Sequence, residues 1–390
     1  MNKRTIFVGI LAIVLIIGVF MQSNGVEPET PNQNTTDDPV SETVRASRIA
    51  SWLAKKGDLI ASGKPYDLVM AGWFSPDEAV QLRENNPDVI LLAGLSCTWV
   101  WDNQAWMDFL LNVASYGQDE PYVITEDMYL HNQTGGRCAF GWASEEWQQE
   151  EIYGMDPRNS DWVELILSFY ENVIDQPQHD GIIVDMVVEK QYWCPNAITD
   201  EEWLNSTKDI YKKLKELKTE DKLVIFNAGG TLEDINEYSD YFDGYLMENY
   251  LGTQMKTNFT DGLEAADSDY IVIYNVDTDD TGVVDVNRMR LGYSLSLLND
   301  NTYFTYDFGP RDHGQAWWYP EYDVKLGDPK GEYYMRENAY WREFEKGYVV
   351  AAPVGAQITF TSLVTDVTNN QTSTSFTITE GDGRIYLKTD

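Results

Sequence analysis

From about residue 47 onward, short apolar runs alternate with longer amphipathic stretches, and this alternation is the strongest constraint on the fold. The runs are almost continuously hydrophobic, which predicts strands that are covered on both faces, as in a parallel α/β sheet wrapped by helices. Eight such runs occur, at 66–73, 88–96, 122–129, 181–188, 222–229, 243–250, 270–278 and 302–309. They span roughly 240 residues, close to the ~250 that are typical of a (β/α)8 barrel. We therefore predict a (β/α)8, or TIM, barrel over residues 47–345.

An open doubly wound sheet is the alternative, but such sheets usually have fewer strands, and the GxGxxG fingerprint that they use for dinucleotides is absent. Helix signals lie between the apolar runs. Ser75 and Glu78 form a capping-box pattern with Pro76 at the first helical position, and Thr199 with Glu202 repeats the pattern. The longest helices are predicted at 102–116, 161–175, 199–219 and 285–298.

Both ends of the chain differ from this alternating region. A basic start is followed by an uncharged, mostly apolar run that ends at Met21. Residues 1–23 are therefore predicted to be a signal peptide or, as we favour, an uncleaved membrane anchor. Residues 24–46 are rich in Pro, Asn, Thr, Asp and Glu and are expected to form a disordered linker. Residues 346–390 are predicted to form a small antiparallel β-domain that packs on the barrel. We expect the main domain to lie outside the cell or at its surface, either anchored or secreted.

The charge balance and the motif content exclude several classes of function. Acidic residues outnumber basic ones by 64 to 28, which gives a formal net charge of −36 and repels nucleic acids and anionic lipids at long range. No GxSxG motif, HExxH motif or CxxC pair occurs. We therefore expect neither a Ser-His-Asp triad nor a zinc or redox site, and no cofactor. In an oxidising compartment two of Cys97, Cys138 and Cys194 could pair, but their spacing does not say which, and buried free thiols are the alternative.

Carboxylates lie at the ends of the apolar runs, where a parallel barrel brings its βα loops together. They are Glu126, Asp127, Asp185, Glu248, Asp277 and Asp307. An ionised group is costly to hold beside a barrel core unless it has partners or takes part in chemistry. Glycoside hydrolysis needs two facing carboxylates, so we predict Asp185 and Glu248 as the catalytic pair. The alternative is that strand-end acids only cap loops or helices.

Aromatic and polar residues near the same run ends fit a carbohydrate ligand. Flat aromatic faces stack on pyranose rings, while amide and other polar groups bind hydroxyls. The substrate-binding residues that we predict are Trp73, Asp127, Asn227, Tyr250, Asp277, Asp307, Arg311, Trp317 and Trp318. Three of these lie in an unusually long loop at 309–334, and long loops over a barrel mouth are commonly functional. The alternatives are packing for the tryptophans, a turn for Asn227 and an ion pair for Arg311.

Several segments resemble a known family. HDGIIVDMV contains Asp185, LVIFNAGG contains Asn227 and GYLMENYLG contains Glu248, while WWYPEYDVKLGDPKGEYY and YWREFEKGYVVAAP follow later in the chain. In this order and spacing they resemble the hypothetical glycosyl-hydrolase-like family 15 group, which is itself similar to the endo-α-1,4-polygalactosaminidase family. The similarity spans about residues 65–355. It implies a (β/α)8 barrel with Asp185 as the nucleophile and Glu248 as the general acid/base, whereas the substrate does not transfer.

The residues and the resemblance together predict an extracytoplasmic glycoside hydrolase that cleaves O-glycosidic bonds of a polysaccharide or surface glycan by a two-carboxylate, retaining mechanism. The expected partner is this glycan and not a nucleic acid. Membrane contact is expected only through residues 1–23, if they are retained. The chain is otherwise expected to be a monomer. One alternative is a non-catalytic carbohydrate-binding or cell-envelope protein on the same barrel. Another is a calcium or magnesium site formed by the acids at the mouth, although no metal is predicted.

Overall fold

The computed structural model of the chain describes residues 48–140, 152–227, 229, 237–252, 259–266, 270–279, 281–309 and 316–389. The expected anchor (1–23), the expected linker (24–46) and Arg311 lie outside these ranges. Within them, no helix combines the length and the apolar character needed to span a bilayer.

Eight parallel strands form the barrel, which confirms the predicted fold. In ring order they are β1 (Ala50–Trp52), β2 (Leu68–Met70), β3 (Ile90–Ser96), β6 (Gly181–Asp185), β7 (Leu223–Asn227), β8 (Gly244–Tyr250), β9 (Ile271–Asp277) and β10 (Thr302–Asp307). The ring closes where Ile49 pairs with Phe304 in a parallel bridge and the Phe304 N–H donates to the Arg48 carbonyl at 3.0 Å. The strand order does not reverse, which distinguishes the barrel from a doubly wound sheet.

The predicted strand at 122–129 is wrong. This segment contains the 3-10 helix η1 (Glu126–Met128), because its exposed acidic centre interrupts the apolar pattern of a buried strand. The missing barrel strand is β1, where the polar Ser51 interrupts a short apolar segment that is not continued on either side. The sequence pattern thus misses one strand and adds one false strand before Asp185. Asp185 and Glu248 therefore still lie on the fourth and sixth strands of the ring.

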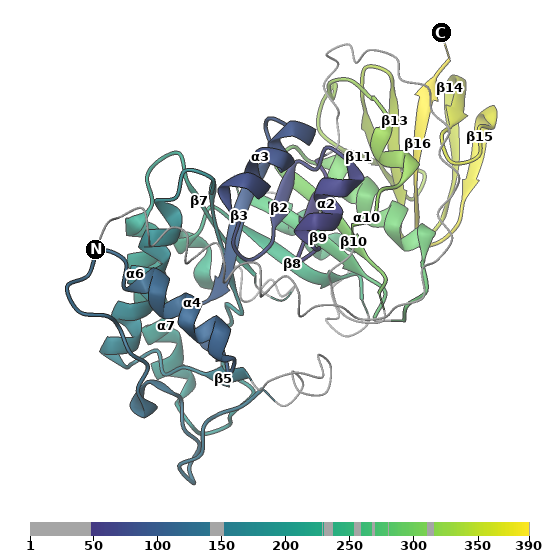
Figure 1. Cartoon of the computed structure of the whole chain (residues 1–390). Coiled ribbons are helices and arrows are strands. Elements are labelled where there is room, and N and C mark those ends of the chain that lie inside the picture. The colour runs from purple at the N-terminus through teal and green to yellow at the C-terminus, as the bar shows by residue number, and fades with distance from the viewer. Residues whose placement is uncertain are drawn as a thin grey trace.

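Helices cover the outer face of the barrel (Figure 1). They are α2 (Lys56–Ser62), α3 (Pro76–Asn85), α6 (Ser160–Ile174), α7 (Asp200–Leu217), α9 (Phe259–Ala266) and α10 (Val286–Leu298), with the 3-10 helix η2 (Ser239–Tyr241) before β8. Both predicted capping boxes are present, at Ser75 with Glu78 and at Thr199 with Glu202. The largest apolar cluster lies between strands and helices. A second cluster fills the inside of the barrel with side chains from all eight strands.

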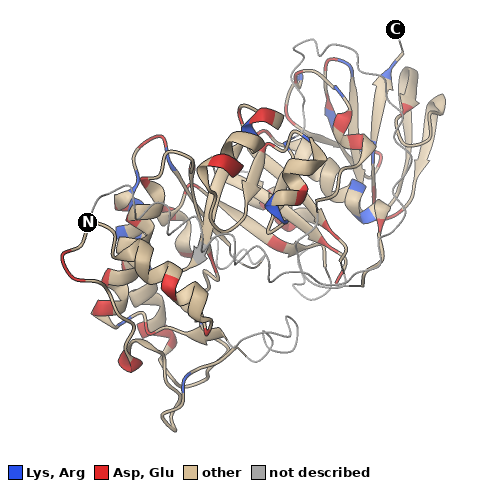
Figure 2. Ribbon diagram, viewed as in Figure 1, with Lys and Arg blue, Asp and Glu red and all other residues tan. Residues whose placement is uncertain are grey.

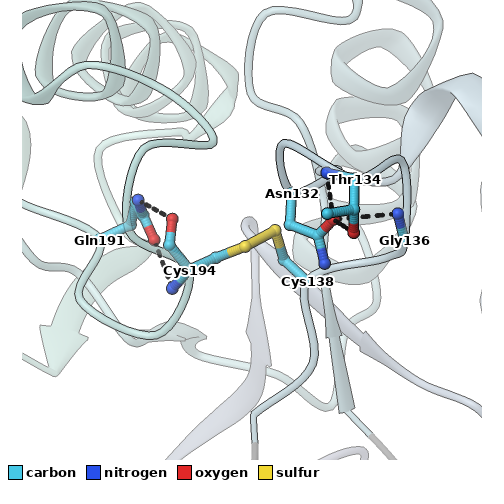
Figure 3. The surroundings of a disulfide bond; sticks show 6 residues. All are labelled: Asn132, Thr134, Gly136, Cys138, Gln191 and Cys194. Atoms are coloured by element: carbon cyan, nitrogen blue, oxygen red, sulfur yellow. Dashed lines mark hydrogen bonds between the residues drawn. A yellow bond between two sulfur atoms is a disulfide. The ribbon is translucent and has the colours of Figure 1, made fainter.

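A long excursion, residues 97–180, separates β3 from β6 in the chain. It contains the antiparallel pair β4 (Trp99–Trp101) and β5 (Ile152–Gly154), helix α4 (Gln104–Ala114) and η1, and it returns to the barrel through α6. Cys138 of the excursion forms a disulfide with Cys194 in the loop after β6, with the two Cα atoms 5.5 Å apart (Figure 3). Cys97 is free and buried. The disulfide ties the excursion to the loop that follows Asp185.

Beyond the barrel, six antiparallel strands form a C-terminal sheet (Figure 1). Their order across the sheet is β11 (Tyr334–Arg336), β12 (Ala339–Glu343), β13 (Gly347–Ala352), β16 (Asp382–Lys388), β14 (Ala356–Asp366) and β15 (Thr372–Ile378). Two of these strands precede residue 346, so the sheet begins before the change in composition. It packs against α10, where Arg290 donates to the two carboxylate oxygens of Asp382 at 2.8 and 3.0 Å.

The negative charge is distributed over the molecule. Figure 2 shows Asp and Glu on helices and loops along the whole length of the structure, with fewer Lys and Arg among them. A spread of this kind supports a general solubilising role for the charge.

Candidate active site

The inside of the barrel changes from apolar to polar at the carboxyl ends of the strands. Side chains alternate between the two faces of a strand, so interior positions recur at every second residue. The apolar interior layer includes Ile183, Ile225, Leu246, Ile273 and Tyr303. Two residues further along the same five strands are Asp185, Asn227, Glu248, Asn275 and Thr305. Three of the predicted site residues therefore occupy one polar layer at the mouth of the barrel.

Asn227 joins the two predicted catalytic acids. Its Nδ2 donates one hydrogen bond to Asp185 Oδ1 and another to Glu248 Oε2, each at 2.9 Å. The Gly229 N–H donates to Asn227 Oδ1 at 3.0 Å, which turns the amide nitrogen toward the acids. Because both carboxylate oxygens lie 2.9 Å from one nitrogen, they are at most twice that distance apart. Asp185 and Glu248 therefore face one shared space.

Trp52, which the sequence pattern does not single out, also belongs to this group. It is the last residue of β1, and its Nε1–H donates to Glu248 Oε1 at 2.8 Å. Both oxygens of Glu248 thus accept a hydrogen bond, one from Trp52 and one from Asn227. The only local signal is a tryptophan at the end of the short apolar segment 49–52, since its partner lies 196 positions later in the sequence.

The donors and the acids of this group differ in exposure. Asn227 is 1% exposed and Trp52 is 5% exposed, whereas Asp185 and Glu248 are half-buried. The two donors therefore belong to the protein interior, and the two acids reach the surface of the mouth. This arrangement gives rigid support to acids that a ligand can contact.

The backbone turns sharply after three of these residues. Leu53 follows Trp52, Met186 follows Asp185 and Asn249 follows Glu248, and their φ angles are 53°, 57° and 51°. Leucine and methionine rarely adopt this left-handed conformation, because Cβ then crowds the following carbonyl oxygen. Such strained residues cluster at functional sites, where the surrounding structure enforces them. A left-handed residue follows each of Trp52, Asp185 and Glu248, which are connected by hydrogen bonds, and this supports the assignment of all three to one site.

Asp277 and Asp307 lie at the carboxyl ends of β9 and β10, but both are nearly buried. Oδ1 of Asp277 accepts from the Asp279 N–H, and Oδ1 of Asp307 accepts from the Gly309 N–H at 3.0 Å. Each aspartate thus bonds the backbone two residues further on, as strand-end aspartates do when they form turns. These contacts match the loop-capping alternative.

Tyr250 does not lie at the mouth, although its spacing from Glu248 predicts the same face of β8. The pairing of β8 with β9 shifts register between Met247 and Tyr250, and a one-residue shift moves a side chain to the opposite face. Tyr250 is fully buried on the helix side, with its ring 5.3 Å from that of Tyr274. Burial raises the pKa of its hydroxyl. In this position Tyr250 packs in the core and is closed to a substrate.

Two other predicted binding residues lie apart from the acids. Asp127 is exposed in the excursion, where its side chain and its carbonyl accept hydrogen bonds from Asn159 Nδ2 at 3.2 and 3.0 Å. A hydrogen bond from the Thr125 side chain lowers the pKa of Asp127. Trp73 packs edge-on against Phe109 of α4 and His179, with ring centroids 5.6 and 4.7 Å away. The structure thus places Asp127 and Trp73 in local packing and capping contacts.

The tryptophan pair after β10 lies against the outside of the barrel. The Trp317 ring stacks on Phe308 at 4.6 Å, and the Trp317 carbonyl accepts from the Tyr66 hydroxyl at 3.1 Å. Trp318 packs edge-on against Tyr66 at 5.2 Å, and its Nε1 donates to Asp323 Oδ1 at 3.0 Å in the 3-10 helix η3 (Pro320–Asp323). The contacts of Trp318 are those of a packing residue, whereas Trp317 lies next to the end of β10. Arg311, from the same loop, lies outside the described residues.

The mouth of the barrel is rich in acids, and carboxylates are ligands for hard metal ions. In the parts of the chain that the structure describes, no three His, Cys, Asp or Glu side chains are grouped so as to hold a metal ion. The groups that do converge are two carboxylates joined by the Asn227 amide, with the Trp52 indole N–H on the other oxygen of Glu248, and they suit proton transfer to a ligand.

Comparison with known proteins identifies one family. The family described as hypothetical glycosyl hydrolase family 15 matches residues 83–348, more than half of the chain. The curated proteins contain no match to this sequence.

Solved structures show remote likeness. A GH36 α-galactosidase from Geobacillus stearothermophilus has a TM-score of 0.48 and 11% identity, covering 89% of this chain and 55% of that one. A maltogenic α-amylase from Thermotoga neapolitana has a TM-score of 0.46 and 9% identity, covering 87% and 96%. An α-amylase from Malbranchea cinnamomea has a TM-score of 0.46 and 12% identity, covering 88% and 96%.

Proposed function

The chain belongs to hypothetical glycosyl hydrolase family 15, and from this premise we propose that it cleaves O-glycosidic bonds of a polysaccharide or surface glycan, with Asp185 and Glu248 as its two acids. Membership of the family supports glycoside hydrolysis. The observation that carries the choice of residues is the amide nitrogen of Asn227, which donates to both acids at 2.9 Å. A sugar held over this amide would have one carboxylate on each side of the bond to be cleaved.

The spacing of the acids supports a retaining mechanism. Retaining glycosidases hold their carboxyl groups about 5–5.5 Å apart, and inverting ones about 6.5–9.5 Å apart to admit a water molecule. The facing oxygens of Asp185 and Glu248 are at most twice 2.9 Å apart, which is below the inverting range. We therefore propose that the substituted anomeric carbon is attacked directly by a carboxylate.

In the proposed reaction, Asp185 attacks the anomeric carbon while protonated Glu248 gives its proton to the leaving oxygen. The glycosyl–Asp185 ester is then hydrolysed by water, and Glu248 takes a proton from that water. The assignment of Asp185 as nucleophile follows the family resemblance. Asn227 has an N–H directed at each acid. One N–H therefore donates to the Asp185 carboxylate before the attack, and the other donates to the Glu248 carboxylate after Glu248 has lost its proton.

The two acids can be tested by single isosteric substitutions. Glu248→Gln should lower kcat by about 10²–10⁴-fold, and Asp185→Asn by at least as much, because the covalent intermediate can no longer form. The assay is release of new reducing ends from a panel of polysaccharides. Asp209→Asn and Glu216→Gln, exposed on α7, are matched controls that should retain full activity. Undiminished turnover in both site variants, or glycan binding without product release by the unaltered protein, would contradict the proposal.

The stereochemistry of the product tests retention. Proton NMR of the first anomer formed should show the same configuration as the cleaved bond. If the opposite anomer forms first, the covalent step is ruled out and water attacks the anomeric carbon directly. Both acids would still be essential in that mechanism.

We also propose that the protein works outside the cytoplasm. The Cys138–Cys194 disulfide supports this location, because structural disulfides persist in oxidising compartments, and the apolar run that ends at Met21 supplies an export signal or an anchor. Alkaline phosphatase fused after residue 46 should be active in cells, since that enzyme matures only after export. An inactive fusion would reject the location.

A further inference from the structure

We propose that Trp52 is a positioning residue for Glu248: its indole N–H fixes the carboxyl group of Glu248 in the direction from which it exchanges a proton with the substrate. This inference rests on the proposed function. It assigns a role to a residue on β1, a strand that carries none of the predicted catalytic or binding residues. The geometry behind it is the 2.8 Å hydrogen bond from Trp52 Nε1 to Glu248 Oε1.

The two oxygens of Glu248 are held from two directions. Trp52 donates to Oε1 from β1, and Asn227 donates to Oε2 from β7 at 2.9 Å. A carboxyl group with one donor can still rotate about its terminal torsion, which is broad for glutamate. Two donors on different oxygens remove that freedom. The lone pair that carries the acidic proton is then directed at a constant angle into the mouth.

Trp52 is itself immobilised, which a positioning residue requires. Its side chain is 5% exposed and packs in the apolar interior of the barrel with Met70 and Leu92. Behind it the Leu53 N–H donates to the Met70 carbonyl at 2.9 Å, and Leu53 has a φ of 53°. The turn after Trp52 is therefore pinned to β2, and a rigid indole supports a half-buried acid.

The hydrogen bond also affects when Glu248 holds its proton. A donor stabilises the ionised carboxylate more than the protonated form, so loss of the indole N–H favours the protonated form and extends it to higher pH. The other acids near the mouth are Asp185 on β6, two strands away from β8, and Asp277 on β9 and Asp307 on β10, each two residues beyond the polar layer that contains Glu248. A change confined to Trp52 leaves these three acids in place.

Trp52→Phe tests the proposal, because it keeps an aromatic ring and removes the N–H. With a hydrolysed glycan, kcat should fall about tenfold or more, the loss expected for one hydrogen bond to a charged group, while KM stays within about twofold. The alkaline limb of the kcat/KM profile, which reports the acid of the free enzyme, should move up by about one pH unit. The matched control is Trp341→Phe in the C-terminal sheet, which removes an indole bond to the Arg336 carbonyl and should leave the profile in place.

A second measurement needs no glycan. In proton–nitrogen NMR spectra of the unaltered protein, one indole N–H resonance should shift as Glu248 titrates; it should be missing from Trp52→Phe and should not titrate in Glu248→Gln. Absence of hydrolysis by the unaltered protein would reject the proposed function, but the hydrogen bond between Trp52 and Glu248 could still be measured by NMR. An unchanged pH profile in Trp52→Phe, movement of the acidic limb instead, or a Trp52 resonance that ignores Glu248→Gln would overturn the positioning role.

Discussion

His179 illustrates what burial does to one titratable side chain. The residue is fully buried just before β6, where the Phe74 N–H donates to Nε2 at 3.3 Å and the other ring nitrogen lies 2.9 Å from the Val173 carbonyl. These two contacts fit a neutral imidazole with its proton on Nδ1. Removal from water lowers the pKa of His179 to about 4 from its usual 6.5. The folded protein therefore holds His179 neutral over a range in which the unfolded chain is protonated.

This difference predicts a pH dependence of stability. The unfolded chain binds a proton at His179 near pH 6.5 and the folded chain only near pH 4, so the unfolded state gains protons first as the pH falls. The contribution of His179 to the free energy of unfolding should be present in full above about pH 6.5. It should fall by on the order of 3 kcal/mol as the pH approaches 4. Urea unfolding at about pH 7 and about pH 4.5 measures the drop. His179→Gln should show a clearly smaller drop, and an equal one would contradict this origin.

At the scale of elements, one covalent link holds the excursion to the site. Cys138 and Cys194 are 56 positions apart in the chain. Gln191 secures the second cysteine, since its Nε2 donates to the Cys194 carbonyl at 2.6 Å and its Oε1 accepts from the Cys194 N–H at 2.9 Å (Figure 3). Leu130 and Trp203 pack in the same buried cluster. The disulfide thus supports the loop that begins directly after Asp185.

Removing this link should destabilise the fold. A disulfide that closes a loop of this length restricts the unfolded chain by about 4 kcal/mol. The double variant Cys138→Ser with Cys194→Ser should therefore unfold at a lower urea concentration than the oxidised protein. Added reductant should lower the midpoint of the unaltered protein and have no effect on the double variant. If reductant leaves the unaltered protein unchanged, the disulfide contributes no stability.

At the scale of the whole molecule, α10 joins the barrel to the C-terminal sheet. Every residue from Met289 to Leu298 is buried, because one side of the helix packs on β9 and β10 and the other on the sheet. Asp382 at the start of β16 is fully buried and accepts hydrogen bonds from both Arg290 and Arg384. A Cβ on Gly383 would lie 2.4 Å from the Arg290 carbonyl, so the helix and the strand are in close contact. The two parts share one helix and one ion-pair network.

Unfolding of the barrel and the sheet should therefore be a single transition. Asp382→Ala leaves the Arg290 guanidinium buried without its carboxylate, which should cost about 3–5 kcal/mol. Far-UV circular dichroism and tryptophan fluorescence should report the same, lower urea midpoint. Lys330→Ala is the matched control: its ion pair with Glu343 spans 3.3 Å between side chains that are 50% and 36% exposed, so the urea midpoint should stay close to that of the unaltered protein. Two separate transitions would show that the sheet and the barrel are independent.

The features that the sequence predicts correctly are those that depend on residues close together in the chain. Near-continuous apolar runs mark seven of the eight barrel strands, since burial on both faces leaves a direct trace in composition. The capping boxes at Ser75 and Thr199 mark two helix starts, because their hydrogen bonds join residues three positions apart. Asp185, Asn227 and Glu248 follow interior positions by two residues, so alternation alone directs them to the mouth.

The sequence by itself determined the barrel, most of its strands and the acids at their ends, because these features depend on contacts within a few residues. Only the tertiary structure decided that β1 closes the ring, that Trp52 bonds Glu248 across 196 positions and that Cys138 pairs with Cys194. It also decided that Tyr250 points into the core, since a register shift in β8 reverses the face that alternation predicts. Closure and register are set by the packing of all eight strands together, and no local pattern records them.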